Sequence, residues 1–115
     1  MAFEKLKQIT KPIEELHRER LDSRYQGLDL VRIGEAPMRV PVRIGGEVES
    51  LHVVPRADSS TLEVTVADGT GKAVAVFLGR RRIASLSPGR HLVLEGVLHK
   101  DEHRIVMINP AYTFS

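Results

Sequence analysis

Residues 62–82 read LEVTVADGTGKAVAVFLGRRR, two alternating segments that are joined by a glycine-rich turn and followed by three arginines. The first segment places Leu62, Val64 and Val66 on one side, which is the period-two pattern of a half-buried strand. The turn DGTG supplies positive-φ positions that suit a tight hairpin. The second segment repeats the alternation, with three apolar residues expected inward: Val74, Val76 and Leu78. The pattern predicts a β-hairpin at the centre of an all-β domain.

Length and composition limit the classes of protein to which this chain can belong. Its 115 residues allow one domain with an extension, and the absence of cysteine excludes disulfides and thiolate metal sites. No apolar run reaches the roughly 18 residues of a membrane span, and the charged amino terminus lacks the pattern of a signal peptide. We therefore expect a cytoplasmic protein that makes no contact with a membrane. The net charge is only +2, and the ten basic and eight acidic residues of 36–115 account for all of it.

Residues 1–36 are predicted to form an N-terminal α-helical extension and a connector. Apolar residues recur at helical spacing within residues 2–25, and Pro12 predicts a break or kink. The apolar stripe consists of Phe3, Leu6, Ile9, Ile13 and Leu16. One interpretation is a polar, partly frayed extension. The other is a helix that docks on a protein partner or on a second copy of the chain, giving a homodimer.

Residues 37–115 carry the signals of five strands. The first strand runs from Val40 to about Val53, and its phase switches after Gly45-Gly46, as in a bulged and coiled strand. The central hairpin follows, then a short helical turn over 81–86, a strand over 91–98 and a last strand over 104–108. This order predicts a five-stranded OB-fold Greek-key barrel.

The chain also resembles a known family in four stretches, VRIGGEVESLHVVPR, TLEVTVADGTGKAVAVFLGRRRI, SPGRHLVLEGVL and INPAY. Over residues 40–115 it is similar to small stand-alone OB-fold proteins of actinobacteria. It is similar as well to the OB wedge domain of RecG-type helicases and to anticodon-binding OB domains. The resemblance implies nucleic-acid contact on the face of the second and third strands. The flanking loops would be Pro55 to Ser60 and His99 to His103, and the outward residues of the third strand would be Ala73, Ala75 and Phe77.

The residues themselves indicate how such contact would be made. Guanidinium groups bind phosphate oxygens in a bidentate manner, and an aromatic ring stacks on a base. The candidate binding residues are Arg43, Arg56, Lys72, Phe77, Arg80, Arg81, Arg82 and Arg104. Two alternatives remain open at this point. The arginines could be a solvated surface, and the Phe77 ring could be covered by the N-terminal helix.

Catalytic, cofactor and metal sites are not expected. His99 and His103 flank a hairpin tip, but no ligand spacing of a metalloenzyme accompanies them. No nucleophile–base arrangement or phosphate-cradling glycine loop is present. The sequence therefore predicts a non-enzymatic protein, without cofactor or metal, that binds single-stranded or branched nucleic acid weakly, with DNA favoured over RNA. The alternative is an OB-fold adaptor for protein–protein interaction that assembles through the N-terminal helix.

Overall fold

The computed structural model describes residues 28–115, and all of the regular structure there is strand except one short 3-10 turn. The predicted helix over residues 2–25 lies outside the described residues. The elements are β1 (Leu30–Val31), η2 (Ile33–Glu35), β2 (Pro41–Pro55), β3 (Ser60–Ala67), β4 (Lys72–Leu78), β5 (His91–Asp101), β6 (Arg104–Ile108) and β7 (Ala111–Phe114). Within residues 28–115 there is no helix with the length and apolar character needed to cross a membrane.

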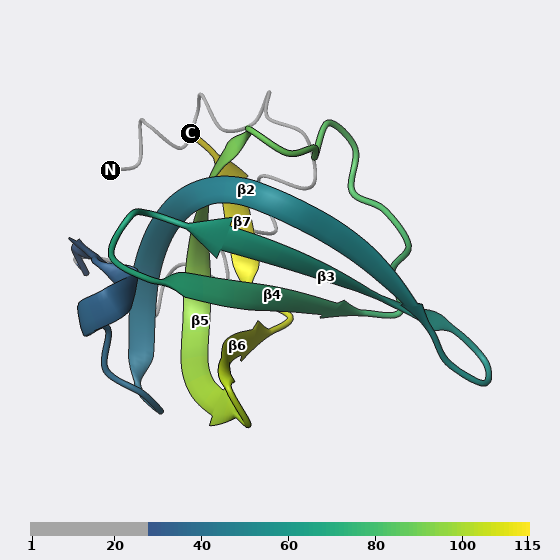
Figure 1. Ribbon diagram of the computed structural model, residues 1–115, viewed down its shortest axis with the longest axis horizontal. Coiled ribbons are helices and arrows are strands. Elements are labelled where there is room, and N and C mark those ends of the chain that lie inside the picture. The colour runs from purple at the N-terminus through teal and green to yellow at the C-terminus, as the bar shows by residue number, and fades with distance from the viewer. Residues whose placement is uncertain (1–27) are drawn as a thin grey trace, which may run out of the picture.

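Five of the strands form a nearly closed ring in the order β2–β3–β4–β6–β5, and β5 pairs with β2 again (Figure 1). The long strand β2 closes the ring because residues 41–47 pair with β5 and residues 47–55 pair with β3. The β4–β6 pair is parallel, whereas the other neighbours in the ring are antiparallel. The expected OB-like barrel is thus confirmed at the level of architecture.

The bend of β2 arises at its glycine pair, as the sequence predicts. A Cβ on Gly46 would lie 2.9 Å from the carbonyl oxygen of Ala67, so a side chain there would force β3 away from β2. The register with β3 also shifts between Val48 and Ser50, which is a bulge. A bulge and a glycine increase the local coiling, and one strand can then serve two sides of the barrel.

The β3–β4 hairpin confirms one predicted phase and corrects the other. Leu62, Val64 and Val66 are at most 1% exposed, as expected for the inward side of β3. On β4, however, the buried core residues are Ala73, Ala75 and Phe77. The prediction that these three face outward is wrong, because they pair directly with Val66, Val64 and Leu62, and residues directly opposite in an antiparallel pair share a face.

The connection from β4 to β5 also differs from its prediction. Residues 81–86 form a turn in which the Leu86 N–H donates to the Ile83 carbonyl at 3.1 Å, and no helix is present there. Ser85 has a φ of 66°, which breaks the right-handed backbone that a helical turn needs. The Ile83 side chain is 7% exposed and belongs to the same core cluster as Phe77. The loop therefore contributes an apolar side chain to the barrel core without forming a helix.

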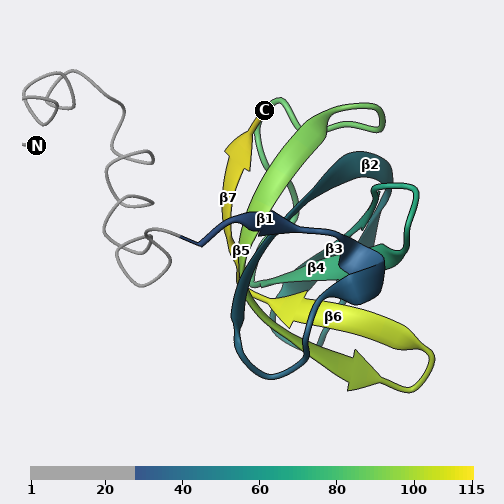
Figure 2. The same ribbon diagram turned by 90° about the vertical axis from the view of Figure 1, so that its left-hand side faces the viewer.

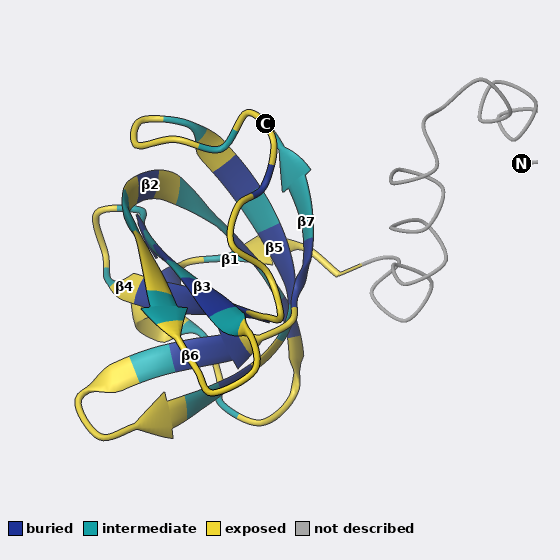
Figure 3. Cartoon of the chain, turned by 90° about the vertical axis from the view of Figure 1, so that its right-hand side faces the viewer, coloured by how far each residue is buried: buried dark blue, intermediate teal, exposed yellow. Residues whose placement is uncertain are grey.

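Two short strands flank the ring. β1 pairs in parallel with β2. β7 pairs with residues 92–95 of β5, on the edge opposite to β2, whereas β6 pairs with residues 98–101 of β5. The Tyr112 ring on β7 meets the Phe77 ring edge-on, with centroids 5.8 Å apart, and Phe114 packs beside Tyr112. Both C-terminal aromatic side chains are partly buried against the core cluster. In Figure 3 the buried residues follow the strands, while the loops and the β5–β6 hairpin tip are exposed.

The hairpin turn between β3 and β4 is fastened to η2 by Asp68, and η2 lies against this end of the hairpin in Figure 2. The Asp68 carboxylate accepts the Ile33 N–H at 2.9 Å, the Thr70 N–H at 2.9 Å and the Thr70 hydroxyl at 2.6 Å. Partial burial raises the pKa of Asp68, but the hydrogen bonds from Thr70, Ile33 and Gly71 outweigh it and hold the pKa below 3.8. Of the two glycines in this turn, Gly69 and Gly71, only Gly69 has the positive φ that the sequence predicts for the turn. The ionised Asp68 therefore stabilises the fold.

Replacing Asp68 with asparagine is expected to lower the free energy of unfolding at pH 7 by about 1 to 2 kcal/mol, because charge-assisted hydrogen bonds become neutral ones. Since the folded pKa is depressed, the stabilisation is present above the unfolded value of 3.8 and is lost as the pH falls through the folded pKa. Urea unfolding at neutral and acidic pH measures both effects. The exposed Asp58 supplies the control, Asp58→Asn. Equal stabilities of the two variants at pH 7 would contradict the role of Asp68.

Candidate functional site

Two of the predicted binding residues, Arg43 and Lys72, lie beside carboxylates, but only Arg43 is committed to its partner. The Nε atom of Arg43 lies 2.8 Å from Oε2 of Glu95, whose side chain is only 5% exposed. Removing a partner from such a pair leaves a buried charge uncompensated, so Arg43 is a structural residue beside β1 and β5. Lys72 lies 3.1 Å from Glu49, but both side chains are well exposed and the pair is worth little. Lys72 thus remains accessible to an anion, whereas Arg43 does not.

Arg104 is paired as well. Its Nη1 atom donates to Oε1 of Glu63 at 2.9 Å, and its Nη2 atom donates to Oδ2 of Asp101 at 3.4 Å. The hydrogen bond with Glu63 raises the pKa of Arg104, which therefore stays charged throughout the accessible pH range. The guanidinium is held on the barrel surface by two acidic side chains and is not a free cation.

The three consecutive arginines differ from these residues. Arg80, Arg81 and Arg82 are exposed, and within residues 28–115 their side chains have neither an ion pair nor a hydrogen bond. The Gly79 N–H donates to the Ser60 carbonyl at 2.8 Å, which fixes the start of this segment beside the start of β3. We call residues 80–82 the arginine segment. It lies where the hairpin of β3 and β4 has its open end.

Arg56 lies at the same end of the hairpin, in the loop from β2 to β3. It is exposed, and its Nε atom makes a long hydrogen bond of 3.4 Å to the Thr61 hydroxyl. The fold thus brings Arg56 and the arginine segment to one end of the β3–β4 pair, although 24 or more positions separate them in the chain. Four cationic groups at one end of a sheet form a local basic region despite the small net charge.

The outer face of β4 and β6 adjoins this region and is largely aliphatic. Val74, Val76 and Val106 form a cluster on it, separate from the barrel core. Leu78 and Ile108 extend the face towards the arginine segment and are 52% and 48% exposed. Together these five residues constitute the valine face. Since the Phe and Tyr residues of 28–115 all pack in or against the core, the face offers no ring for base stacking.

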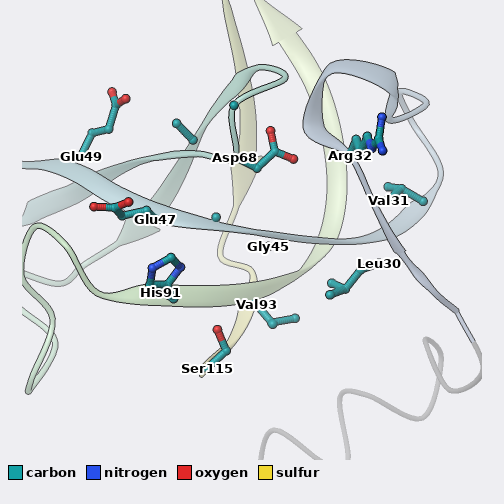
Figure 4. A pocket seen from close by; sticks show the side chains of 13 residues that line it. Leu30, Val31, Arg32, Gly45, Glu47, Glu49, Asp68, His91, Val93 and Ser115 are labelled. Atoms are coloured by element: carbon teal, nitrogen blue, oxygen red, sulfur yellow. The ribbon is translucent and has the colours of Figure 1, made fainter.

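A groove of about 710 Å³ lies elsewhere, between β1 and the β3–β4 turn (Figure 4). Leu30 and Val93 provide apolar walls, and Gly45 leaves the β2 backbone uncovered. The lining carries three carboxylates, those of Glu47, Glu49 and Asp68, against the one guanidinium of Arg32. A phosphate ligand would therefore meet mainly like charges there. In the part of the chain that the structure describes, no group of three or more His, Asp or Glu side chains is placed to hold a metal ion.

Comparisons with known proteins locate the chain by fold. No protein-family model and no curated protein matches the sequence. Among solved structures, the chain is similar to one in the S. pombe Stn1–Ten1 complex, with a TM-score of 0.52, 19% identity and coverage of 65% of this chain. A second structure, described as "structural mimicry for functional antagonism", gives a TM-score of 0.57, 13% identity and coverage of 74%. The fold is OB-like.

These matches cover only part of the matched chains and have low sequence identity. The chain spans 57% and 44% of the lengths of the two matched chains. At such identities the similarity concerns the backbone architecture, and the ligand has to be inferred from the side chains of this protein. The sequence predicts the arginine segment as a candidate site, but it does not reveal the acidic partners of Arg43, Lys72 and Arg104. The sequence signal for Glu63 is its outward phase on β3, which places it on the same outer face as Arg104.

Proposed function

We propose that this protein is a non-enzymatic OB-fold module that binds single-stranded or branched nucleic acid, DNA in preference to RNA. The arginine segment captures phosphates, and the adjoining outer face of β3 and β4 lies against the strand. The observation that carries the proposal is the exposure of three adjacent guanidinium groups without acidic partners among residues 28–115. Such groups bind phosphate oxygens in a bidentate manner. The resemblance of residues 40–115 to small actinobacterial OB-fold proteins and to helicase wedge domains supports the same function.

The proposed binding is weak and has little dependence on sequence. Arg43 and Arg104 are held by carboxylates, so the number of free cations at the site is small. Each stacked base would add about 1 to 3 kcal/mol, but Phe77 is 4% exposed and takes no part. Phosphate contacts position a strand without reading its bases. The ligand is therefore selected by its backbone and shape.

Affinity for single-stranded DNA is expected to fall steeply with salt. Three or four phosphate contacts, each with a log–log slope near −0.7, predict a loss of about 20- to 50-fold between about 50 mM and about 200 mM salt. Fluorescence anisotropy with labelled single-stranded, duplex and forked DNA, and with single-stranded RNA, measures the slope and the preference. Absence of binding to every one of these at the lower salt concentration would refute the proposed function.

A second function is favoured by the valine face. An aliphatic surface with Leu78 and Ile108 half exposed is better suited to another protein than to bases, and one structural neighbour belongs to a complex of two proteins. The alternative is an adaptor that assembles with a protein partner or as a homodimer, with the helix predicted over residues 2–25 contributing. Light scattering on the full chain separates the two functions. A dimeric mass without nucleic-acid binding would favour the adaptor.

A further inference from the structure

The ion pair of Arg104 and Glu63 crosses the proposed binding face. Arg104 lies on β6 and Glu63 on β3, and β4 separates these strands in the sheet. The 2.9 Å contact between their side chains therefore passes over the outer side of β4. Outward residues of β4 lie beneath this path, among them Val74 and Val76.

The burial of the valines agrees with this arrangement. Val74, Val76 and Val106 point away from the barrel core, yet they are only 7%, 8% and 3% exposed. Val74 and Val106 are direct neighbours in the β4–β6 register. The aliphatic stem of an arginine covers apolar surface while its guanidinium stays at the surface. Arg104, drawn across the sheet by Glu63, is suited to cover this cluster.

The charges at this place oppose an anionic ligand. Arg104 contributes one positive charge, whereas Glu63 and Asp101 contribute two negative charges. The Glu63 side chain is 17% exposed, so its charge is only partly screened by water. A phosphate that reached the middle of the face would compete with Glu63 for the same guanidinium. At the arginine segment, by contrast, no carboxylate of the described residues is paired with the cations.

We infer, on the basis of the proposed function, that Glu63 is a specificity-determining residue of the nucleic-acid site. It withholds Arg104 from ligand phosphates and thereby confines phosphate contact to the arginine end of the face. The site accordingly takes a short stretch of backbone, such as a strand that turns away after a few nucleotides. A backbone that follows the whole length of β4 is disfavoured, because its phosphates would approach Glu63 and Asp101.

Glu63→Gln tests this inference. Releasing Arg104 is expected to tighten binding of oligothymidylate by about three- to tenfold at about 50 mM salt and to steepen the log–log slope by about 0.7, the value for one added phosphate. Affinity should also continue to rise with oligonucleotide length beyond the length at which it levels off for the parent. The control is Glu35→Gln, which removes the same charge from the exposed pair formed by Glu35 at the end of η2 and Arg32 just before η2, 3.8 Å apart. Less than a twofold change is expected there.

Arg104→Ala completes the cycle. In the parent background it should leave the affinity nearly unchanged, because the guanidinium is already occupied, whereas in the Glu63→Gln background it should abolish the gain. If thermal melts show that Glu63→Gln unfolds the barrel, Asp101→Asn is the substitute test. It removes the second, more exposed carboxylate and should give a smaller gain in affinity. Equal affinities of Glu63→Gln and Glu35→Gln, in folded proteins, would overturn the inference. A marked loss of affinity on Arg104→Ala alone would do so too.

The outcomes also separate this inference from the proposed function. If the parent binds and Glu63→Gln binds no more tightly, the role of Glu63 is wrong and the function stands. If the parent fails to bind but Glu63→Gln binds with dependence on Arg104, the role of Glu63 stands and the proposed function of the parent is refuted. If neither protein binds any of the oligonucleotides, both the function and the role of Glu63 are refuted.

Discussion

Replacing Phe77 with alanine is expected to lower the free energy of unfolding by about 3 to 5 kcal/mol, the usual range for deleting a buried ring. The Phe77 side chain is 4% exposed, belongs to the core cluster with Ile83 and meets the Tyr112 ring at 5.8 Å. Ile83 of the β4–β5 loop and Tyr112 of β7 would both lose the Phe77 ring as a neighbour. The cavity would therefore lie where β4, this loop and β7 meet. In a domain of this size the melting temperature should fall by about 15 °C or more. Calorimetry or urea unfolding measures the change.

Leu78→Ala is the matched control for Phe77→Ala. Leu78 is the next residue on β4, lies on the other side of the sheet and is 52% exposed. Its truncation should change the stability by about 0.5 kcal/mol or less. If Phe77→Ala kept the melting temperature of the parent and weakened single-strand binding instead, the ring would be a stacking platform and its assignment to the core would be wrong.

The strands could be predicted from the sequence because their causes are local. On β3 the inward residues Leu62, Val64 and Val66 alternate with polar residues, so one side of the strand is unambiguous. The coil of β2 could be predicted from Gly45-Gly46 together with the phase change that follows it. Each of these signals lies within one strand and does not depend on its partner.

The phase of β4 could not be obtained in the same way. Residues 73–78 alternate between alanine or phenylalanine and valine or leucine, so both sides are apolar and neither is marked as the inner one. Only the register with β3, in which Ala75 is opposite Val64, determines which side enters the core. The valine side then faces outward. This pairing is a property of two strands, and a pattern within one strand does not contain it.

In the candidate site, too, some features follow from the local sequence and others only from the pairing of distant strands. The arginine segment has no acidic neighbour in the sequence, and its exposure follows from that local excess of charge. The partner of Arg104, in contrast, is Glu63, which is 41 positions away and is brought close only by the order of the strands. Arg43 is likewise matched to Glu95 across a strand pair. Free and neutralised arginines therefore look alike in the sequence and differ in the fold.

Changing Arg80, Arg81 and Arg82 together to glutamine is expected to weaken binding of single-stranded DNA by about 10- to 100-fold at about 50 mM salt. Glutamine keeps much of the side-chain length and removes the charge, so three phosphate contacts are lost and three fewer counterions are released. The log–log salt slope should become shallower by about 2, because each contact contributes about 0.7 on a single strand. The residues are exposed, and within residues 28–115 their side chains make no ion pair or hydrogen bond, so the stability should remain within about 0.5 kcal/mol of the parent.

The matched control for this variant removes three positive charges from other exposed positions, Arg32, Arg39 and Lys100, again by glutamine. It lowers the net charge equally but leaves the end of the β3–β4 hairpin intact. Long-range attraction depends on the total charge of the protein, whereas direct phosphate contact depends on where the arginines lie. Only the variant of residues 80–82 should therefore flatten the salt slope by about 2. Equal losses in both variants would show that the attraction is diffuse. Parent-like binding by the first variant, in a protein that melts normally, would show that the arginine segment is a solvated surface with no part in binding.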